Sequence, residues 1–343
     1  MTIKNIAIIG TGMAGISCAK TLCAAGKKVT LFEKSVGPGG RVSSRLFEYW
    51  SADHGAQYFT AKEESFKAVA DSWLNQGFIK PWLGKIVSYN KNQFLDVDNS
   101  GQRYVGVPAM NSLAKFLIAD MPVQFSQTIC KLEKVGDVWN LFSKEQGRIR
   151  ESFDLIVLAI PSKQAADLIP NRLTNLQKIC ANTRMLPCWT LIAYQDSKIA
   201  LPFDGAFMDE SPFAWIARNN SKPSRSMYES WTAQATTEWS NEFVNRNNYE
   251  VEPVLVSAFE KITGQPCRLY QSHLWRYARV ENPRNESYIL NKENQIGICG
   301  DWLLHSTVEG AWTSGSLLGE KINQLSTEDA IERTITQVAS NPG

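Results

Sequence analysis

The sequence predicts an α/β protein whose parallel sheet is assembled from early, middle and late parts of the chain, with a mostly antiparallel α+β segment inserted between them. Three mainly apolar runs lead to this prediction: Asn5–Ile9, Phe153–Ile160 and Gln295–Cys299. Such runs are typical of strands that are buried on both faces of a parallel sheet. An edge strand would alternate apolar and polar residues, so Phe153–Ile160 is expected in the same sheet as Asn5–Ile9.

The first run opens a strand–helix–strand unit. A helical pattern covers Met13–Ala25, and Gly26 ends that helix. Lys28–Phe32 is then predicted as a second strand, with Glu33 at its end. A glycine just past a helix, followed by a β-branched run, is the expected order in such a unit.

Between the first strand and the helix, Gly10, Gly12 and Gly15 have the spacing G-x-G-x-x-G. Gly10 allows a tight turn, Gly12 lets the backbone approach a pyrophosphate, and Gly15 lets helix and strand pack closely. The helix N-terminus offers N–H groups to the anion, and Glu33 would accept hydrogen bonds from ribose hydroxyls. A plain buried βαβ unit would not need all three glycines. We therefore predict a Rossmann-like dinucleotide site formed by Gly10, Gly12, Met13, Ala14, Gly15, Glu33 and Lys34.

A second glycine cluster, residues 37–40, leads into Arg41. This loop would cradle a second phosphate, with Arg41 pairing to it, although a surface turn with an exposed arginine is the alternative. The stretch Asp53–Lys62 (DHGAQYFTAK) suits a loop packed against a flat ligand, although a buried loop beside a sheet would look similar. The predicted cofactor contacts here are Gly40, Arg41, His54, Gly55, Ala56 and Gln57.

A distal element lies near the end of the chain. GDW at Gly300–Trp302 is followed by VEGAW at Val308–Trp312, which opens a helix expected to run to about Gln324. Asp301 would bind a ribitol hydroxyl, and N–H groups around Glu309–Trp312 would stabilise negative charge on a flavin. An extended dinucleotide such as FAD needs this second element, whereas a nicotinamide does not. The predicted contacts are Gly300, Asp301, Val308, Glu309, Gly310 and Ala311.

The order of these elements predicts a discontinuous Rossmann-like FAD-binding domain with an inserted, mostly antiparallel α+β substrate domain. We assign residues 1–65, 107–163 and 293–325 to the first, 66–106 and 164–292 to the second, and 326–343 to a polar tail.

Shorter elements are also predicted within these domains. Ile129–Val135 and Val138–Phe142 alternate around a Gly-Asp turn and predict a hairpin. The aromatic-rich inserted part is expected to hold strands at Trp189–Tyr194 and Pro212–Ala217 and a helix at Pro253–Ile262.

Composition narrows the class of partner. Lys and Arg total 36 against 34 Asp and Glu, a formal charge of +2, so there is no basic footprint for nucleic acid or an acidic membrane. The seven cysteines include no C-x-x-C pair, so neither a metal site nor a disulfide scaffold is predicted, and a cytoplasmic location is expected. No apolar run reaches the roughly 18 residues of a membrane span.

The combination of G-x-G-x-x-G, the acid after the second strand, GPGGR and the distal GDW…VEGA resembles the FAD-dependent amine oxidase and p-hydroxybenzoate-hydroxylase-like superfamily. More narrowly, the chain resembles the bacterial renalases over nearly its whole length, to about Leu325. The matching stretches are DHGAQYFTA, WIARNNSKP (Trp215–Pro223), HLWRYAR (His273–Arg279) and ICGDW…VEGAWTSG (Ile298–Gly315).

This resemblance implies non-covalently bound FAD and a particular reaction. Such proteins oxidise the 2- or 6-dihydro isomers of NAD(P)H by hydride transfer to flavin N5. They return NAD(P)⁺ and pass the electrons to oxygen, giving hydrogen peroxide. The protein itself would orient the dihydropyridine ring and exclude water, because the cofactor carries the difficult chemistry.

The resemblance also suggests a substrate pocket. Arg218 and Asn219 are the candidates to bind the carboxamide, with Trp302, Tyr58 and Gln57 as walls. Alternatively, Arg218 caps a strand end and the tryptophans belong to the core. Gln234 stands where the bacterial relatives are expected to carry a histidine, and it would keep hydrogen bonding but lose proton transfer.

Two other functions stay open at this stage. A flavin amine oxidase or desaturase on the same fold would commonly show two parallel aromatic rings and a lysine near flavin N5, and neither is identifiable in the sequence. A monooxygenase would need reducing equivalents from NAD(P)H, and there is no second G-x-G-x-x-G. A non-catalytic flavin-binding protein is the remaining alternative.

Overall fold

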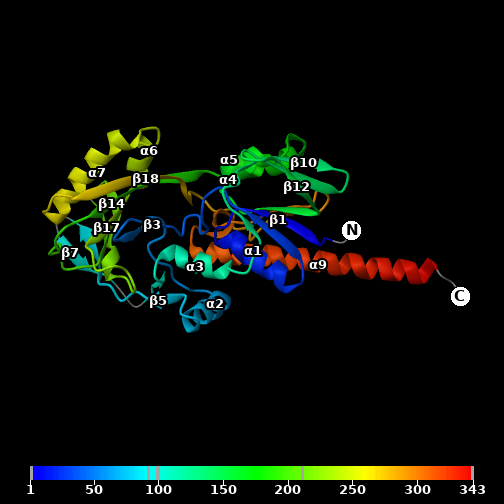
Figure 1. Cartoon of the computed structure of the whole chain (residues 1–343), viewed down its shortest axis with the longest axis horizontal. Coiled ribbons are helices and arrows are strands. Elements are labelled where there is room, and N and C mark those ends of the chain that lie inside the picture. Colours follow the sequence, from blue (N-terminus) through cyan, green and yellow to red (C-terminus); the bar gives the residue numbers. More distant parts are fainter. Residues whose placement is uncertain (1–2, 91–92, 98–100, 210–211, 341–343) are drawn as a thin grey trace. The chain divides into compact units, whose positions relative to one another are not determined.

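The computed structural model describes residues 3–90, 93–97, 101–209 and 212–340 (Figure 1). The chain forms two compact units. The first comprises Met1–Gly40, Leu117–Arg184 and Val280–Gly343, and the second comprises Arg41–Phe116 and Met185–Arg279. These units describe spatial compactness, and the predicted functional domain boundaries stay a prediction.

A six-stranded sheet forms the centre of the first unit. Strand β1 (Asn5–Ile9) pairs in parallel with β2 (Lys28–Phe32) on one side and with β13 (Leu155–Leu158) on the other. The sheet is completed by β9 (Val123–Gln124) beside β2, β20 (Ile296–Ile298) beside β13, and an antiparallel edge strand, β19 (Ile289–Asn291). The predicted parallel sheet from three distant parts of the chain is confirmed.

Helices α1 (Met13–Ala24) and α9 (Val308–Ser340) lie side by side in this unit (Figure 1). A Cβ atom on Gly315 would lie 2.0 Å from the carbonyl oxygen of Ala14, so only glycine permits this approach. Helix α9 continues past its predicted end near Gln324, because residues 321–340 contain neither glycine nor proline to stop it. The last three residues of the predicted tail lie outside the described part of the chain.

The first unit also contains the predicted hairpin. Strands β10 (Ile129–Val135) and β11 (Val138–Ser143) pair in antiparallel fashion across the Gly136 turn, and β12 (Gly147–Phe153) adds a third strand. Its remaining helices are α4 (Ser162–Leu168), η1 (Asn171–Leu173), α5 (Thr174–Asn182) and α8 (Asp301–Leu304).

A seven-stranded, mostly antiparallel sheet dominates the second unit, in the order β18-β14-β17-β16-β15-β6-β7. Its strands are β18 (Leu269–Val280), β14 (Met185–Tyr194), β17 (Ser230–Ala235), β16 (Phe213–Arg218), β15 (Gly205–Met208), β6 (Ile86–Asn90) and β7 (Gln93–Asp96). The smaller elements are β3 (Ser44–Leu46), β4 (Ser51–Asp53), α2 (Glu64–Asn75), β5 (Ile79–Pro81), β8 (Tyr104–Gly106), α3 (Met110–Leu117), η2 (Asn219–Ser221) and α6 (Thr237–Glu242).

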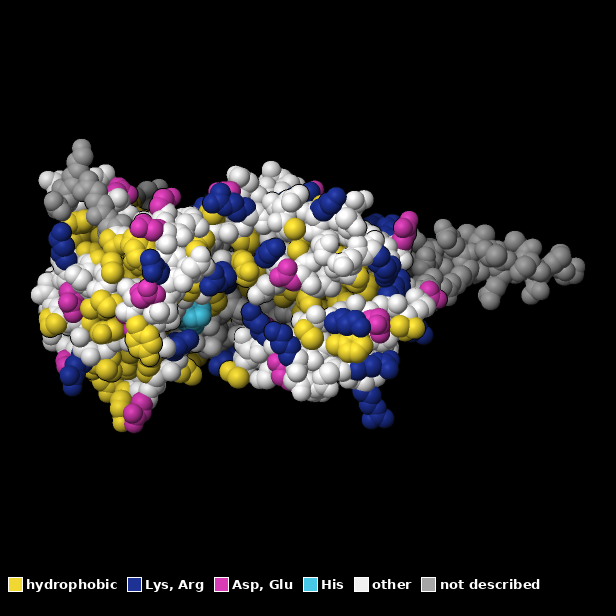
Figure 2. All heavy atoms as spheres, turned by 90° about the horizontal axis from the view of Figure 1, so that it is seen from above, with side chains coloured by type: hydrophobic (Ala, Val, Ile, Leu, Met, Phe, Trp, Pro, Cys, Tyr) yellow, Lys and Arg dark blue, Asp and Glu magenta, His cyan; other side chains and the backbone are white. Residues whose placement is uncertain are grey.

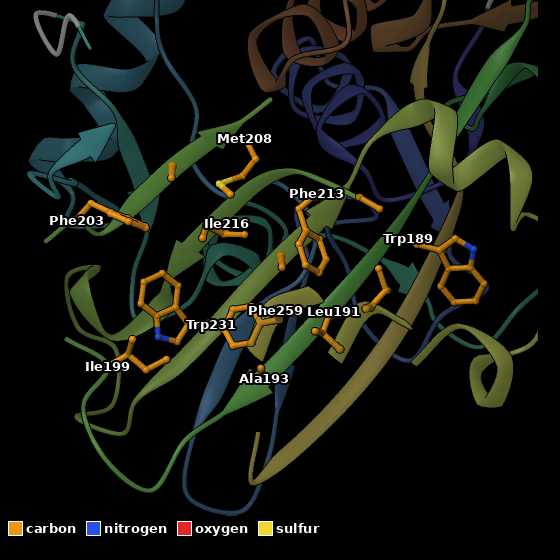
Figure 3. Packing of buried hydrophobic residues seen from close by; sticks show 14 of the residues in the cluster. Trp189, Leu191, Ala193, Ile199, Phe203, Met208, Phe213, Ile216, Trp231 and Phe259 are labelled. Carbon is orange, nitrogen blue, oxygen red and sulfur yellow. The ribbon is translucent and has the colours of Figure 1, made fainter. Parts of the chain in front are cut away.

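Strand alternation divides this sheet into an apolar face and a polar face. Trp189, Leu191 and Trp231 point into a core that also contains Phe259 of helix α7 (Figure 3). Residues between them along the same strands, such as Thr190, point to the opposite face, because successive side chains of a strand alternate. The polar face carries the candidate site of this unit.

Helix α7 (Asn248–Thr263) begins five residues before its predicted start at Pro253. Asn247 and Glu250 form a capping box that sets the true N-terminus. Pro253 has no N–H to donate to the carbonyl of Tyr249, and Tyr249 is 89% exposed, so water can satisfy that group. The sequence prediction treated the proline as the first turn, which placed the start too late.

The surface carries charges of both signs. On the face drawn in Figure 2, basic and acidic side chains are interspersed, as the near-zero net charge leads one to expect. Among the described residues, no helix combines the length and the apolar character needed to cross a membrane.

Candidate functional site

The turn between β1 and α1 can only be built from glycine at two positions. Gly10 has φ +105°, and a Cβ there would lie 2.5 Å from the carbonyl oxygen of Ala159 at the end of β13. A Cβ on Gly15 would lie 2.1 Å from the carbonyl oxygen of Gly10. These glycines therefore allow the helix to begin directly against the sheet, as the sequence predicts.

Gly12 is different, because a Cβ there would meet no atom within 4 Å. It is the N-cap of α1, and it provides no side chain to satisfy the N–H groups of the first turn. The second glycine loop lies against it: Gly39 donates to the Thr11 carbonyl at 2.9 Å, and Gly40 adopts φ +55° close to Gly12. Open space beside an uncapped helix N-terminus fits a phosphate group.

Glu33 is buried and held in place at the end of β2. One carboxylate oxygen accepts from the N–H and hydroxyl of Thr11, at 3.0 and 2.7 Å, and the other accepts from the N–H of Ser35 at 2.9 Å. The second oxygen retains a lone pair that could receive a ribose hydroxyl. The neighbouring Lys34 is exposed.

The distal element of the first unit is well buried. Trp302 is fully buried and donates from its indole to the carbonyl of Ile160 at 3.1 Å, next to the Gly10 turn. Gly300 donates to the hydroxyl of Ser314 at 2.9 Å, and Asp301 is also buried. Trp302 therefore braces the dinucleotide turn, and its predicted role as a pocket wall stays a prediction.

The start of α9 contains the predicted Val308, Glu309, Gly310 and Ala311. The N–H groups of Gly310 and Ala311 donate to the hydroxyl and carbonyl of Thr307, at 2.9 and 3.0 Å. Because these two groups are engaged within the first turn, any stabilisation of negative charge here would come from the helix dipole. Glu309 is buried.

In the second unit, a buried ion cluster fixes Asp53 at the end of β4. Its carboxylate receives Lys222 at 3.2 Å and Arg225 at 2.7 Å, and all three side chains are at most 1% exposed. Burial alone would raise the pKa of Asp53, but the two cations hold it well below its usual range. Burial lowers the pKa of Lys222 to about 8, against the attraction of Asp53.

Asn219 secures the same loop from η2. Its side-chain oxygen accepts from the N–H of Asp53 at 3.0 Å, and its NH₂ donates to the Thr232 hydroxyl at 3.0 Å. Thr232 in turn donates to the Asp53 carbonyl at 2.9 Å. Asn219 is fully buried and both polar atoms are engaged, so this geometry gives it a structural contact in place of the free donor and acceptor expected for a carboxamide.

The following residues, 54–57, are held at each carbonyl. Gln234 on β17 donates to the Gly55 carbonyl at 2.8 Å, and Trp275 on β18 donates to the His54 carbonyl at 2.8 Å. Gln57 donates to the Gly55 carbonyl at 3.1 Å and accepts from Lys222 at 3.1 Å. A Cβ on Gly55 would lie 1.9 Å from the carbonyl oxygen of Arg41, and Ala56 donates to that same oxygen at 2.8 Å.

Arg218 lies apart from this loop network. It ends β16, donates to Glu229 at 2.8 Å and to the Ile199 carbonyl at 3.0 Å, and lies over the Trp231 ring at 4.7 Å. It is 4% exposed, so these contacts agree with the alternative in which it caps a strand end. It also lines a pocket of about 280 Å³ together with Lys198.

Tyr58 belongs to an aromatic group. Its ring centroid lies 6.0 Å from Trp82 and 5.6 Å from Trp215, with interplanar angles of 44° and 61°. Lys222 lies over Trp82 at 5.5 Å and Arg103 lies over Tyr58 at 5.3 Å. The rings surround Tyr58 without lying parallel to it.

The sequence reasoning missed the ion cluster. Lys222 stood inside the singled-out stretch WIARNNSKP, and Asp53 opened DHGAQYFTAK, but nothing in either stretch indicated that they meet. The one available signal was the presence of charged residues within otherwise small and aromatic stretches, which suggests paired burial.

Comparison with known proteins agrees with this geometry. Residues 8–73 match the model of an NAD(P)-binding Rossmann-like domain. The L-amino-acid oxidase of Daboia russelii is 48% identical over 54 residues, and that of Sistrurus catenatus edwardsii is 30% identical over 128 residues. These alignments cover 15% and 36% of this chain, and 11% and 22% of the relatives' own length.

Solved structures match over nearly the whole chain. A putative protoporphyrinogen oxidase from Exiguobacterium sp. 255-15 has a TM-score of 0.75 at 12% identity, covering 94% of this chain and 99% of that one. Cyclohexylamine oxidase from Brevibacterium oxydans IH-35A has a TM-score of 0.72 at 12% identity, with the same coverage. The chain has the fold of these oxidases. The predicted α/β class with a Rossmann-like domain is thereby confirmed.

Proposed function

We propose that this chain is an FAD-dependent oxidoreductase that binds FAD without a covalent link. The open space at Gly12, beside the uncapped N-terminus of α1, carries this proposal. Glu33 would receive the adenosine ribose, and the distal residues around Asp301 would receive the ribitol. The predicted FAD-binding and substrate domains, and a cytoplasmic location, are part of the same proposal.

For the reaction, we infer oxidation of the 2- or 6-dihydro isomers of NAD(P)H. Bound FAD would supply a hydride acceptor at N5 and would return the electrons to oxygen as hydrogen peroxide. The chain's own contribution is a rigid loop at residues 53–58, held by Gln234, Asn219 and the ion cluster, against which a flat ring can be oriented. Tyr58 would contact that ring, and Gln234 would act by holding Gly55.

A flavin amine oxidase is the second candidate, favoured by the partial match to L-amino-acid oxidases. Two observations favour the first candidate. The described rings around Tyr58 meet at 44° and 61°, which differs from a parallel pair. The buried Lys222 is committed to Asp53 and Gln57. A non-catalytic flavin protein is the third possibility, and turnover excludes it.

An anaerobic reduction experiment tests the reaction. The purified holoprotein is mixed with borohydride-reduced NAD⁺, which contains the isomers, and absorbance of the oxidised flavin is followed. We expect rapid bleaching by the mixture and none by pure 1,4-NADH, with peroxide formed when air is admitted. Bleaching by a simple amine or an L-amino acid, and not by the isomers, would establish the second candidate instead. A colourless protein that cannot be reconstituted with FAD would contradict the cofactor assignment.

A further inference from the structure

A cluster of two imidazoles and a guanidinium lies in the second unit, outside the contacts described so far. His54 follows β4, His273 belongs to β18, and Arg45 belongs to β3. The His54 and His273 ring centroids are 5.0 Å apart, and Trp275 covers both, at 5.1 and 4.4 Å. Three separate elements thus bring nitrogen-bearing side chains together.

The imidazole of His54 is left unsatisfied. The residue is 4% exposed, and its Nδ1 has no hydrogen-bond partner among the described residues. A buried polar atom without a partner costs roughly 1–3 kcal/mol and calls for an explanation. A ligand that supplies the missing contact is one such explanation.

Both imidazoles are neutral near pH 7. Burial, followed by the neighbouring His273 and Arg45, lowers the pKa of His54 to about 3, although Asp53 opposes this. Burial and then Arg45 lower the pKa of His273. The Asp53 carboxylate is already committed to Lys222 and Arg225, so it does not neutralise this cluster.

Arg45 itself makes no hydrogen bond or ion pair with any described residue. It is half-buried, on β3, where its charge acts on both histidines. A guanidinium without a carboxylate, beside an unsatisfied imidazole, has the chemistry of an oxyanion site. Three donors from three elements suit the three free oxygens of a phosphate better than the two of a carboxylate.

We propose that Arg45, His54 and His273 bind a phosphate group of the dinucleotide substrate. This rests on the proposed function, because a dihydronicotinamide dinucleotide carries a diphosphate of its own. The glycine loops of the first unit are assigned to the FAD pyrophosphate, so the substrate needs a separate site. An anion bound here would raise the pKa of both histidines, and binding would therefore take up protons and tighten as pH falls.

Calorimetry on the FAD-loaded protein tests the site directly. Inorganic pyrophosphate should bind, and Arg45→Gln should weaken it at least tenfold. Arg268→Gln should leave it unchanged, because Arg268 is 69% exposed and paired with Asp196 on the surface. Sulfate, whose charge is constant between about pH 6 and 8, should bind more tightly at the lower pH. Equal pyrophosphate binding by the Arg45 variant, or no binding at all, overturns the proposal, and so does a preference for acetate.

Histidine NMR gives a second readout that does not depend on turnover. The chain contains three histidines, and His305 belongs to the first unit, so it serves as an internal reference. Pyrophosphate should shift the ring signals of His54 and His273 and leave that of His305 in place. Shifts confined to His305 would contradict the assignment.

Kinetics separate this site from the proposed reaction. Arg45→Gln should raise KM for the dihydronicotinamide dinucleotide about tenfold, without changing FAD content. It should not change KM for a phosphate-free N-alkyl dihydronicotinamide. If neither compound is oxidised, the proposed function fails while the pyrophosphate measurements still decide the anion site.

Discussion

Gly12 and Gly15 belong to the same motif but differ in what an added methyl group would meet. At Gly12 no atom lies within 4 Å, whereas at Gly15 the Gly10 carbonyl would be 2.1 Å away. Gly15→Ala should therefore lower the stability of the protein by several kcal/mol, as overpacking and backbone strain do. Gly12→Ala should leave the unfolding free energy of the FAD-free protein within about 0.5 kcal/mol and weaken FAD binding at least tenfold.

Denaturant unfolding and flavin titration of the same variants measure both effects. Gly101→Ala is the matched control, since its Cβ would also meet open space in a loop of the second unit. If Gly12→Ala bound FAD as tightly as the parent, the phosphate cradle would lie elsewhere.

Asp53 carries the largest residue-scale effect. Asp53→Asn leaves two buried cations without a counter-charge and should cost about 3–5 kcal/mol. Asp196→Asn, in an exposed pair, should cost at most about 1 kcal/mol. Urea unfolding near neutral pH compares the two.

The pH dependence of stability follows from the same cluster. The lowered pKa of Asp53 means that its stabilisation is present above about pH 4, its unfolded value, and is lost as the pH falls through the folded value. Lys222 has a folded pKa of about 8, below its unfolded value, so stability should rise with pH above 8. In Asp53→Asn the Lys222 pKa falls further, and this rise should begin at a lower pH. A variant whose unfolding free energy has the same pH profile as the parent would disprove this coupling.

At the scale of elements, the first strand, helix and second strand were predictable within a residue of their observed ends. Each is decided by local signals: a continuous apolar run, a glycine at the helix end with φ +75°, and a second β-branched run. Helix α7 was misplaced because Pro253 was weighed above the Asn247 cap. The end of α9 was missed because no breaker residue marks it.

Helix α7 offers a direct measurement of that cap. Asn247 accepts from the N–H of Glu250 at 3.1 Å, so Asn247→Ala should lower stability by about 1 kcal/mol. Asn245→Ala, on the preceding exposed turn, should change it by less than about 0.5 kcal/mol. Equal thermal midpoints for the two variants would show that the capping box does not set the start of the helix.

At the scale of the whole molecule, the sequence shows which residue types are present but not which distant ones meet. Asp53, Lys222 and Arg225 are brought together by β4 and the segment after η2, which are far apart in the chain. Likewise, Gln234 and Asn219 were expected to face substrate, and the structure shows them holding the backbone of residues 53–55. Strand alternation indicates a face, and only the packed sheet shows what covers that face.

Ligand-linked stability distinguishes FAD from NAD⁺ for the intact chain. The Rossmann-like match alone is compatible with either dinucleotide, whereas the distal element near Asp301 suits the longer one. FAD added to the flavin-free protein at about 100 times its Kd should stabilise it by about 2.7 kcal/mol, because it binds only the folded state. NAD⁺ at the same concentration should give a much smaller shift in Tm by differential scanning fluorimetry, and Gly12→Ala should abolish the FAD shift. A larger shift with NAD⁺ than with FAD would mean that the distal element does not serve a flavin.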